Sequence, residues 1–439
     1  MPKDTRRFQK QSVSKSMSAL ETSELLLESE PGKGLLRAFS SLRQRNFRLV
    51  WSGQMISQIG TGMQVVGQSW LVLELTHSAW QLGLVGALQA LPVLLFSLFG
   101  GVFADRWSKR HVLLLTQSAS TIQALLLWIF IATGTLQLWQ LYLLALLLGC
   151  INCLHLPTSR AFVVELVGRE DLPNAIALNS SLSPLARILG PALGGVIIAV
   201  SSVTMLFLLN ALSFLPVILG LLLIRRHELH VQTLQSTGAG ERQKTWQSLR
   251  EGIQYVWQTP VVLVMILVVG LVLLFGSNFN VVFPLFSITV LHVGATGLGF
   301  LAAATGLGAL LSALWLAWSN RSATARRVLL SMLVFAVLEA AFAVSRLYLL
   351  SLVLIASVGF VEATFATQAM TTLQTVTPDH LRARVISIQV LLFDGTLPPG
   401  YLLIGWLSSL YGAPVALLVC ALLSLLVVGA GWIMWNLMA

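Results

Sequence analysis

The fold of this chain is decided by an uncharged stretch of 22 residues, VTMLFLLNALSFLPVILGLLLI at positions 203–224. A helix of that length extends for about 33 Å, which is enough to cross the hydrocarbon core of a bilayer. Two arginines, Arg225 and Arg226, follow it directly. Because lipid offers the backbone no water to bond, the stretch predicts a transmembrane helix that ends at a basic loop.

The composition of the whole chain supports a membrane protein. Of its 439 residues, 56% are hydrophobic and only 10% are charged. A soluble domain carries about 25% charged residues, so the composition excludes a water-soluble enzyme. Intrinsic disorder of the whole chain is excluded as well, because disorder needs low hydrophobicity and high charge.

Eleven further apolar stretches accompany the first, and none alternates in the way that the strands of a barrel would. We therefore predict an all-α membrane protein with twelve transmembrane helices in two pseudo-symmetric six-helix halves. The predicted spans are 47–75, 80–104, 111–133, 138–158, 174–200, 203–224, 261–290, 296–318, 328–345, 348–371, 384–409 and 413–436.

The basic residues indicate how these spans are oriented. All but two of the 27 Lys and Arg residues lie before the first span, after an even-numbered span or, like Arg48 and Arg384, within the first two residues of the span that follows. The exceptions are Arg187, inside the fifth span, and Arg346, in the loop after the ninth. The positive-inside rule predicts that both termini are cytoplasmic, in the plasma membrane and, for a bacterium, the inner membrane. Positive charge spread over many loops also argues against nucleic acid as a partner.

The chain divides into two copies of one plan. The expected parts are a disordered cytoplasmic tail at 1–36, an N-terminal half at 37–224, a linker with an amphipathic helix at 225–259, and a C-terminal half at 260–439. The halves echo each other at a shift of about 209 residues, at which Gly190-Pro191 parallels Pro399-Gly400. Six plus six spans around a long central loop are typical of transporters built from parallel repeats.

A charged motif lies between the second and third spans: Gly101-Val-Phe-Ala-Asp105-Arg106-Trp-Ser-Lys109-Arg110. It resembles the cytoplasmic signature of the major facilitator superfamily, in which a glycine is usual where Ser108 stands. Gly101 permits close helix contact, and Asp105 can accept hydrogen bonds at the N-terminus of a neighbouring helix, with Arg106 and Arg110 as counter-charges. The resemblance implies that this cluster latches the outward-open state.

A second motif lies in the fifth span: Ala186-Arg187-Ile-Leu-Gly190-Pro191-Ala-Leu-Gly194-Gly195. It resembles the antiporter motif of the same superfamily, with Ala186 in place of the first glycine, and it implies an exporter. Gly190 and Gly194 lie one turn apart and let a partner helix approach, while Pro191 bends the span. Residues 157–179 are similar to the branch that contains enterobactin and macrolide exporters, and the whole resemblance covers 37–436.

A charge in the bilayer centre costs at least about 2.5–3.5 kcal/mol, so each one needs a partner, a cavity or a function. We expect Glu339 to form a structural pair or to reach the interface. Arg187 cannot release its proton, so it cannot relay protons. It can form a structural ion pair or contact the substrate, and the sequence favours neither role. The candidates for proton coupling are therefore Glu362 and Asp394, followed by His155. For Asp394, which lies near Pro398 and Pro399, a gating or helix-cap role is equally open.

Neutral polar residues on the spans are candidates for a substrate cavity. They are Gln54, Gln58, Asn152, Asn278, Asn280, Thr364 and Gln368. Each of them has an alternative role as a hydrogen-bonding contact between neighbouring helices.

Together these features predict a secondary active transporter, namely a proton-coupled exporter of a small, partly hydrophobic molecule such as a drug or siderophore. Proton-coupled uptake of a small nutrient and a non-transporting receptor or scaffold are the alternatives. No enzymatic activity, cofactor or metal is expected, since Cys150 and Cys153 have metal-site spacing but lie in an apolar span without further ligands. The expected partners are the substrate, protons and the lipid bilayer, and a monomer is expected.

Overall fold

The computed structural model describes residues 40–168, 171–230, 250–319 and 323–438. In these ranges the chain consists of α-helices, turns and two short 3-10 helices at Ser40–Arg43 and Arg226–Glu228, and it contains no strand. The predicted all-α fold is thereby confirmed. The tail predicted at 1–36 lies outside the described residues, as does the start of the predicted linker helix, whereas residues 250–258 are helical.

The N-terminal half contains α3 to α9. Their bounds are α3 Arg45–Thr76, α4 Ala79–Arg106, α5 Lys109–Ala132, α6 Leu138–Val167, α7 Leu172–Val200, α8 Val203–Ser213 and α9 Leu215–Leu222. The last two are the halves of one predicted span, divided at Phe214. Pro216 follows this break directly, and its missing N–H removes one hydrogen bond of a continuous helix.

The C-terminal half contains α11 to α18. Their bounds are α11 Pro260–Gly276, α12 Phe279–Thr289, α13 Gly294–Ser319, α14 Ala325–Val344, α15 Tyr348–Val376, α16 Asp379–Gly395, α17 Leu397–Tyr411 and α18 Ala413–Met438. Two predicted spans are again divided, at Ser277–Asn278 and at Thr396. Pro398 and Pro399 account for the second break, because neither supplies a backbone N–H.

Among the described residues, eleven helical segments are long and apolar enough to cross a membrane. The segment that does not meet this measure is α3, the first predicted span, although it is 32 residues long. Its glutamines lower its hydropathy, and Gln54, Gln64 and Gln68 are buried inside the protein. The helix therefore faces its polar side chains inward rather than toward lipid.

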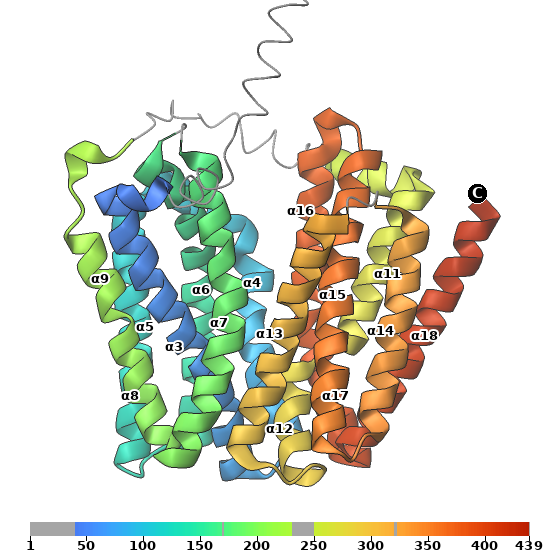
Figure 1. Ribbon diagram of the computed structural model, residues 1–439, viewed down its shortest axis with the longest axis horizontal. Coiled ribbons are helices and arrows are strands. Elements are labelled where there is room, and N and C mark those ends of the chain that lie inside the picture. The colour runs from blue at the N-terminus through green and yellow to red at the C-terminus, as the bar shows by residue number, and fades with distance from the viewer. Residues whose placement is uncertain (1–39, 169–170, 231–249, 320–322, 439) are drawn as a thin grey trace, which may run out of the picture.

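The helices form two bundles (Figure 1). We call the face where α3 begins and α4 and α18 end the basic face, because most of the basic loops lie there; the other is the opposite face. The two halves contact each other mainly through α7 with α13 and α4 with α17. In Figure 1 the bundles converge at the opposite face, where α12 and the start of α13 lie.

Two glycine pairs bring these helices together. A Cβ on Gly195 of α7 would lie 2.9 Å from the Cα of Gly299 on α13, and a Cβ on Gly83 of α4 would lie 3.1 Å from the Cα of Gly405 on α17. Gly83 is near the start of α4 and Gly195 near the end of α7, so both contacts lie toward the opposite face. This face is therefore closed by direct backbone packing between the halves.

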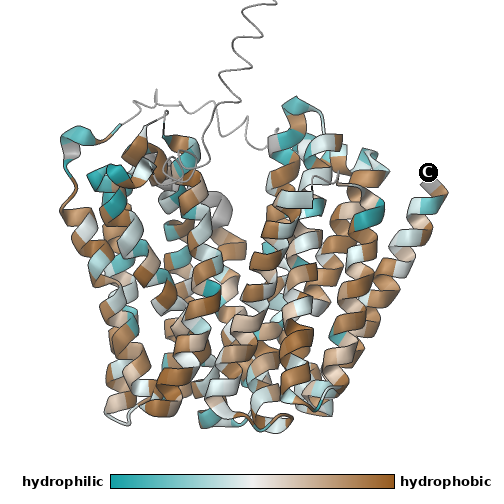
Figure 2. Cartoon of the chain, in the orientation of Figure 1, coloured by the Kyte–Doolittle hydropathy of each residue, from teal (hydrophilic) through white to brown (hydrophobic). Residues whose placement is uncertain are grey.

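The outer surface of the bundle is apolar. Large exposed hydrophobic side chains include Leu314, Trp318, Leu349 and Leu426. Figure 2 shows brown ribbon along the length of the helices and teal mainly toward their ends. A soluble monomer rarely exposes so much apolar surface, and in a membrane it faces lipid.

Candidate functional site

A cavity of about 300 Å³ lies between the two halves, within the span of the helices. Its walls come from α3, α4 and α6 of the N-terminal half and from α12, α16 and α17 of the C-terminal half. Most of the lining side chains are aliphatic, among them Val65, Val85, Leu156 and Leu397. The site therefore suits a ligand with an apolar body, and we call it the central cavity.

Three of the residues singled out from the sequence line the central cavity: Asn152 on α6, Asn280 on α12 and Asp394 on α16. Asp394 is the acidic group of the cavity lining, and its electrostatic partner is Arg160 of the other half. The cavity thus brings one carboxyl and two amides from both halves around one space. Such groups can accept and donate hydrogen bonds to a polar ligand.

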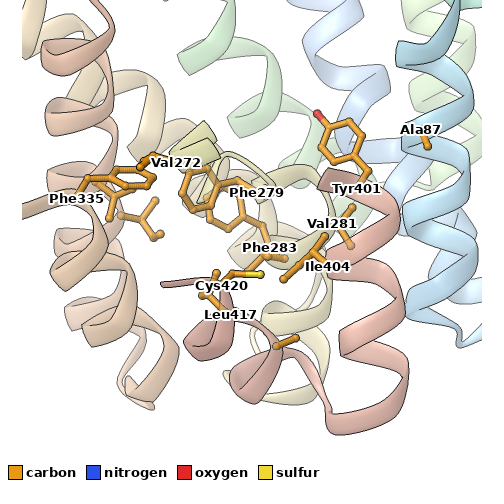
Figure 3. Packing of buried hydrophobic residues seen from close by; sticks show 14 of the residues in the cluster. Ala87, Val272, Phe279, Val281, Phe283, Phe335, Tyr401, Ile404, Leu417 and Cys420 are labelled. Atoms are coloured by element: carbon orange, nitrogen blue, oxygen red, sulfur yellow. The ribbon is translucent and has the colours of Figure 1, made fainter. Parts of the chain in front are cut away.

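Other polar lining residues were missed as site residues. They are Gln68, Ser69, Gln89 and Tyr401. The Tyr401 hydroxyl accepts a hydrogen bond of 3.0 Å from the Asn280 side chain. In Figure 3, Tyr401 lies at the edge of an apolar cluster that continues through Phe279 and Phe283. Its only sequence signal was its place just after the prolines that divide α16 from α17.

Several predicted cavity residues instead hold helices together. Gln54 donates to the Ser159 hydroxyl of α6 at 2.7 Å, and Thr364 shares a hydrogen bond of 2.7 Å with Ser312 of α13. Asn278 donates to the carbonyls of Leu274 and Phe275 at 2.8 and 3.0 Å and so caps the end of α11. Gln54 and Thr364 therefore follow the alternative role that the sequence left open, whereas Asn278 bonds within its own chain segment.

The two remaining predicted cavity residues also lie outside the central cavity. Gln58 is half-buried on α3, and Gln368 is buried on α15. The Gln368 Oε1 atom has no hydrogen-bond partner among the described residues.

The other two candidates for proton coupling have partners in separate halves. The His155 ring nitrogen Nδ1 lies 3.2 Å from the Thr116 hydroxyl of α5, inside the N-terminal half. Glu362 on α15 is half-buried, and its Oε1 accepts a hydrogen bond of 2.6 Å from Ser277 at the end of α11. Neither residue lines the central cavity, so Asp394 is the candidate with direct access to it.

The expectation for Glu339 was wrong. This residue was expected to form a structural pair or to reach the membrane interface, but its side chain is 0% exposed. Neither of its carboxyl oxygens has a hydrogen-bond partner among the described residues. The reason is that α14 turns this position toward α11, α15 and α18, and away from lipid and water.

The antiporter-like motif packs on both halves. A Cβ on Gly190 would lie 2.8 Å from the Cα of Gly62 on α3, and a Cβ on Gly194 would lie 3.1 Å from the Cα of Met63. Gly195 instead faces α13, where the Pro191 carbonyl also approaches Gly299. The motif therefore sits where α7 contacts its own half and its partner half.

Arg187, within the same motif, is exposed and forms no ion pair with a described residue. It lies within electrostatic range of Tyr401, which lines the central cavity.

The charged motif after α4 is described only in part. Gly101, Asp105 and Arg106 belong to α4, but their side chains lie outside the described part of the structure. Lys109 forms an ion pair of 2.6 Å with Glu165 of α6. Arg110 is buried and donates to the Leu221 carbonyl at the end of α9 at 2.6 Å. Lys109 and Arg110 thus bind α5 to α6 and α9.

Comparison with known proteins gives the same architecture. The model of a family described as transmembrane secretion effectors matches residues 36–438. Similar curated proteins include the enterobactin exporter EntS of Citrobacter koseri, 29% identical over 343 residues that cover 77% of this chain and 79% of the relative. The enterobactin exporter EntS of Salmonella typhi is 28% identical, with 77% of this chain and 80% of the relative covered.

Solved transporter structures share the fold at low sequence identity. The nucleoside transporter NupG superposes with a TM-score of 0.72 at 12% identity, over 89% of this chain and 99% of that one. A bacterial homologue of the human lysosomal transporter Spinster, in an inward-facing and occupied conformation, gives a TM-score of 0.69 at 12% identity, over 90% of this chain and 97% of that one. At these identities the likeness concerns the fold alone.

Proposed function

Since the chain belongs to the transmembrane secretion effector family of the major facilitator superfamily, we propose that this transporter is a proton-driven exporter of a small, partly hydrophobic molecule. The protein lies in the inner membrane of a bacterium. Its basic face and both of its termini are on the cytoplasmic side. The excess of Lys and Arg in the loops at that face supports this orientation.

The observation that carries the proposal is the central cavity between the halves. Its volume of about 300 Å³ falls at the lower end of the range for sites that hold drug-sized molecules. Its aliphatic walls suit an apolar body, and Asn152, Asn280 and Asp394 can bind polar groups. The relatives named as enterobactin exporters support a siderophore or a compound of similar character, and they favour export over uptake.

Alternating access follows from where the halves touch. The glycine contacts close the opposite face, so a solute enters the cavity from the basic face in this conformation. Release on the other side requires α7 to part from α13 and α4 to part from α17 near those glycines. The Asp105 cluster then latches the basic face in the outward-open state, as its resemblance to the superfamily signature implies.

Proton binding supplies the driving force when a group binds a proton from one side and releases it to the other. Asp394 lines the cavity, where substrate and proton can compete for one carboxyl. Glu362 and His155 lie away from the cavity lining and are further candidates.

The test is efflux from proteoliposomes that are loaded in turn with siderophores, macrolides and cationic dyes, with and without an imposed pH gradient. We expect one of these classes to leave faster when protons can flow inward. The Asp394→Asn variant should lose most of this acceleration, at least tenfold. Asp379→Asn makes the same change on the same helix at an exposed position and should behave like the parent. Equal rates with and without the gradient for every class would contradict the proposal.

A further inference from the structure

Glu339 is a buried acid whose surroundings do not compensate a negative charge. A Cβ placed on Gly276, the last residue of α11, would lie 3.0 Å from the Glu339 Oε2 atom and in contact with the Phe335 ring. The carboxyl group is therefore wedged against the end of α11. Figure 3 shows Phe335 and Cys420 within the apolar cluster of this half.

The helices packed around Glu339 bring no positive charge to it. Its own helix packs on α11, α15 and α18 and, through Phe342, on α12, which has no ionisable residue. Helix α11 has no ionisable residue, α18 has only Cys420, and α15 has Glu362 and Tyr348. The nearest cations on α14 itself, Arg326 and Arg327, are at its start, at least about 18 Å away along the helix axis. An ionised carboxylate with no partner is too costly in such a place, which favours the neutral acid.

Glu362 lies beside the same break between helices α11 and α12. Its Oε1 accepts a hydrogen bond of 2.6 Å from Ser277, the residue that follows Gly276. Two consecutive residues at the end of α11 thus contact the two carboxyl groups, and the carboxyls lie within electrostatic range of each other. A negative charge on Glu339 would repel a negative charge on Glu362, so a proton on Glu339 removes this repulsion.

One cation, Arg187 of α7, lies near the groups that face Glu362. Helix α13 has no ionisable side chain. On α17, Tyr401 lies within electrostatic range of both Glu362 and Arg187. The charged residues of α16 are Asp379, His380, Arg382, Arg384 and Asp394. All but Asp394 lie within its first six residues, at the basic face.

Glu362 is also the member of the pair nearer to the central cavity. Tyr401 lines the cavity and interacts electrostatically with Glu362. By internal symmetry, Glu362 of α15 corresponds to Asn152 of α6, because each lies equally far in sequence from the start of its helix. Asn152 lines the cavity. Glu362 is half-buried, whereas Glu339 is fully buried.

We propose that Glu339 and Glu362 form one proton-binding site beside the break between α11 and α12, in which Glu362 exchanges the proton with the central cavity and Glu339 holds it. This assignment deepens the proton-driven export proposed above and rests on it for its role in transport. The proton occupies a carboxyl of the pair as the neutral acid, and its release leaves the pair with one more negative charge. The Ser277 contact joins this change of charge to the break between α11 and α12.

Infrared spectroscopy of the full-length protein in lipid tests the site itself, because a protonated carboxyl has a C=O stretching band that an ionised one lacks. We expect such a band in the parent at neutral pH and its loss in Glu339→Gln. The matched control is Glu74→Gln, which changes an exposed carboxyl on α3 and should leave the band in place. A band that survives in Glu339→Gln would overturn the assignment.

A second variant tests whether the two acids act as a pair. Glu362→Gln removes the neighbouring carboxyl, so the Glu339 band should titrate at a lower pH than in the parent. An unchanged midpoint would overturn the pairing. A band that disappears when sodium is added at constant pH would also overturn the proposal, because the site would then bind sodium.

Transport separates this inference from the proposed function. In proteoliposomes, Glu339→Gln should lose acceleration by the pH gradient at least tenfold but keep exchange of substrate down its own gradient. A variant that keeps the acceleration would overturn the role of Glu339 in coupling. If the parent itself does not respond to the gradient, the proposed function fails, while the infrared band still decides whether the carboxyl pair holds a proton.

Discussion

The third membrane span of each half, α5 and α14, carries a buried polar residue at the same position, but the chemistry of that residue differs. Gln123 follows Lys109, the first residue of α5, at the same spacing in sequence as Glu339 follows Ala325, the first residue of α14. Gln123 is 1% exposed and Glu339 is 0% exposed. The two halves therefore use one scaffold position for an amide in one copy and an acid in the other.

The amide belongs to a satisfied chain of hydrogen bonds. Asn210 of α8 donates to Gln64 of α3, which donates to the Gln123 Oε1 atom at 3.1 Å. Gln123 in turn donates to the Leu144 carbonyl of α6 at 3.3 Å. Four helices are joined by neutral groups, each of which has a partner. Glu339 has no such partner among the described residues.

The difference teaches that packing alone does not require an acid at this position. The residue of the C-terminal half that corresponds in position to Asn210 is Cys420, because each is the eighth residue of its helix. A thiol is a weak hydrogen-bond donor and cannot satisfy a carboxyl as the amides satisfy Gln123. At this position the N-terminal half thus holds a neutral, hydrogen-bonded amide, and the C-terminal half holds a carboxyl without a partner among the described residues.

The largest expected effect tests what the halves share, namely their glycine contacts. Leucine at Gly195 or Gly405 would clash with the helix of the other half, so each variant should lower efflux at least tenfold at unchanged membrane insertion. Gly429→Leu, in α18, is the control because no atom lies within 4 Å of its added Cβ. If only one of the two variants lost efflux, the two glycine contacts would not be equivalent. The two halves would then share their fold but not the role of these contacts.

The exchange of the two residues tests what the halves do not share. Gln123→Glu removes the donor to Leu144 and brings an acid into a satisfied chain, so it should destabilise the protein by about 1–3 kcal/mol. Glu339→Gln keeps the shape and replaces one neutral group by another, so its stability should change by less than about 0.5 kcal/mol. Thermal unfolding in detergent measures both. Equal losses would mean that Glu339 is a structural residue.

The sequence predicted the fold well because span length, basic loops and internal repetition are global patterns. It predicted Asn152, Asn280 and Asp394 as site residues because polar groups in apolar spans need a reason to be there. It could not distinguish them from Gln54 or Thr364, since a cavity and a helix contact call for the same side chains. The environment of Glu339 depends on how three neighbouring helices are rotated about their axes. The sequence of its own helix does not determine these rotations.

A smaller effect is expected where one link of the amide chain is removed. Asn210→Leu leaves the Gln64 Oε1 atom without its donor and should cost about 1–2 kcal/mol in thermal stability. Ser409→Ala removes an exposed hydroxyl in α17 and serves as the control. A loss in Asn210→Leu no larger than in the control would show that the amide chain does not stabilise the N-terminal half.

The smallest effect concerns the linker, which is attached differently to the two halves. At its start, the backbone N–H of His230 donates to the Glu165 carbonyl of α6 at 2.9 Å. At its end, Glu251 forms an ion pair with Arg384 of α16, and the two side chains are 57% and 30% exposed. Water and salt screen such a pair, so Glu251→Gln should cost at most about 1 kcal/mol, and less at high salt.

Thermal unfolding of Glu251→Gln at low and high salt measures this contribution, with Glu228→Gln as the control at the other end of the linker. Glu228 pairs with Arg225 within one turn and does not touch α16. The start of the linker is held by a backbone hydrogen bond, which does not depend on side-chain charge. The end of the linker is held by the Glu251–Arg384 ion pair, which water and salt screen. A loss in Glu251→Gln above about 2 kcal/mol that salt does not reduce would mean that the linker is as firmly built into the C-terminal half as into the N-terminal one.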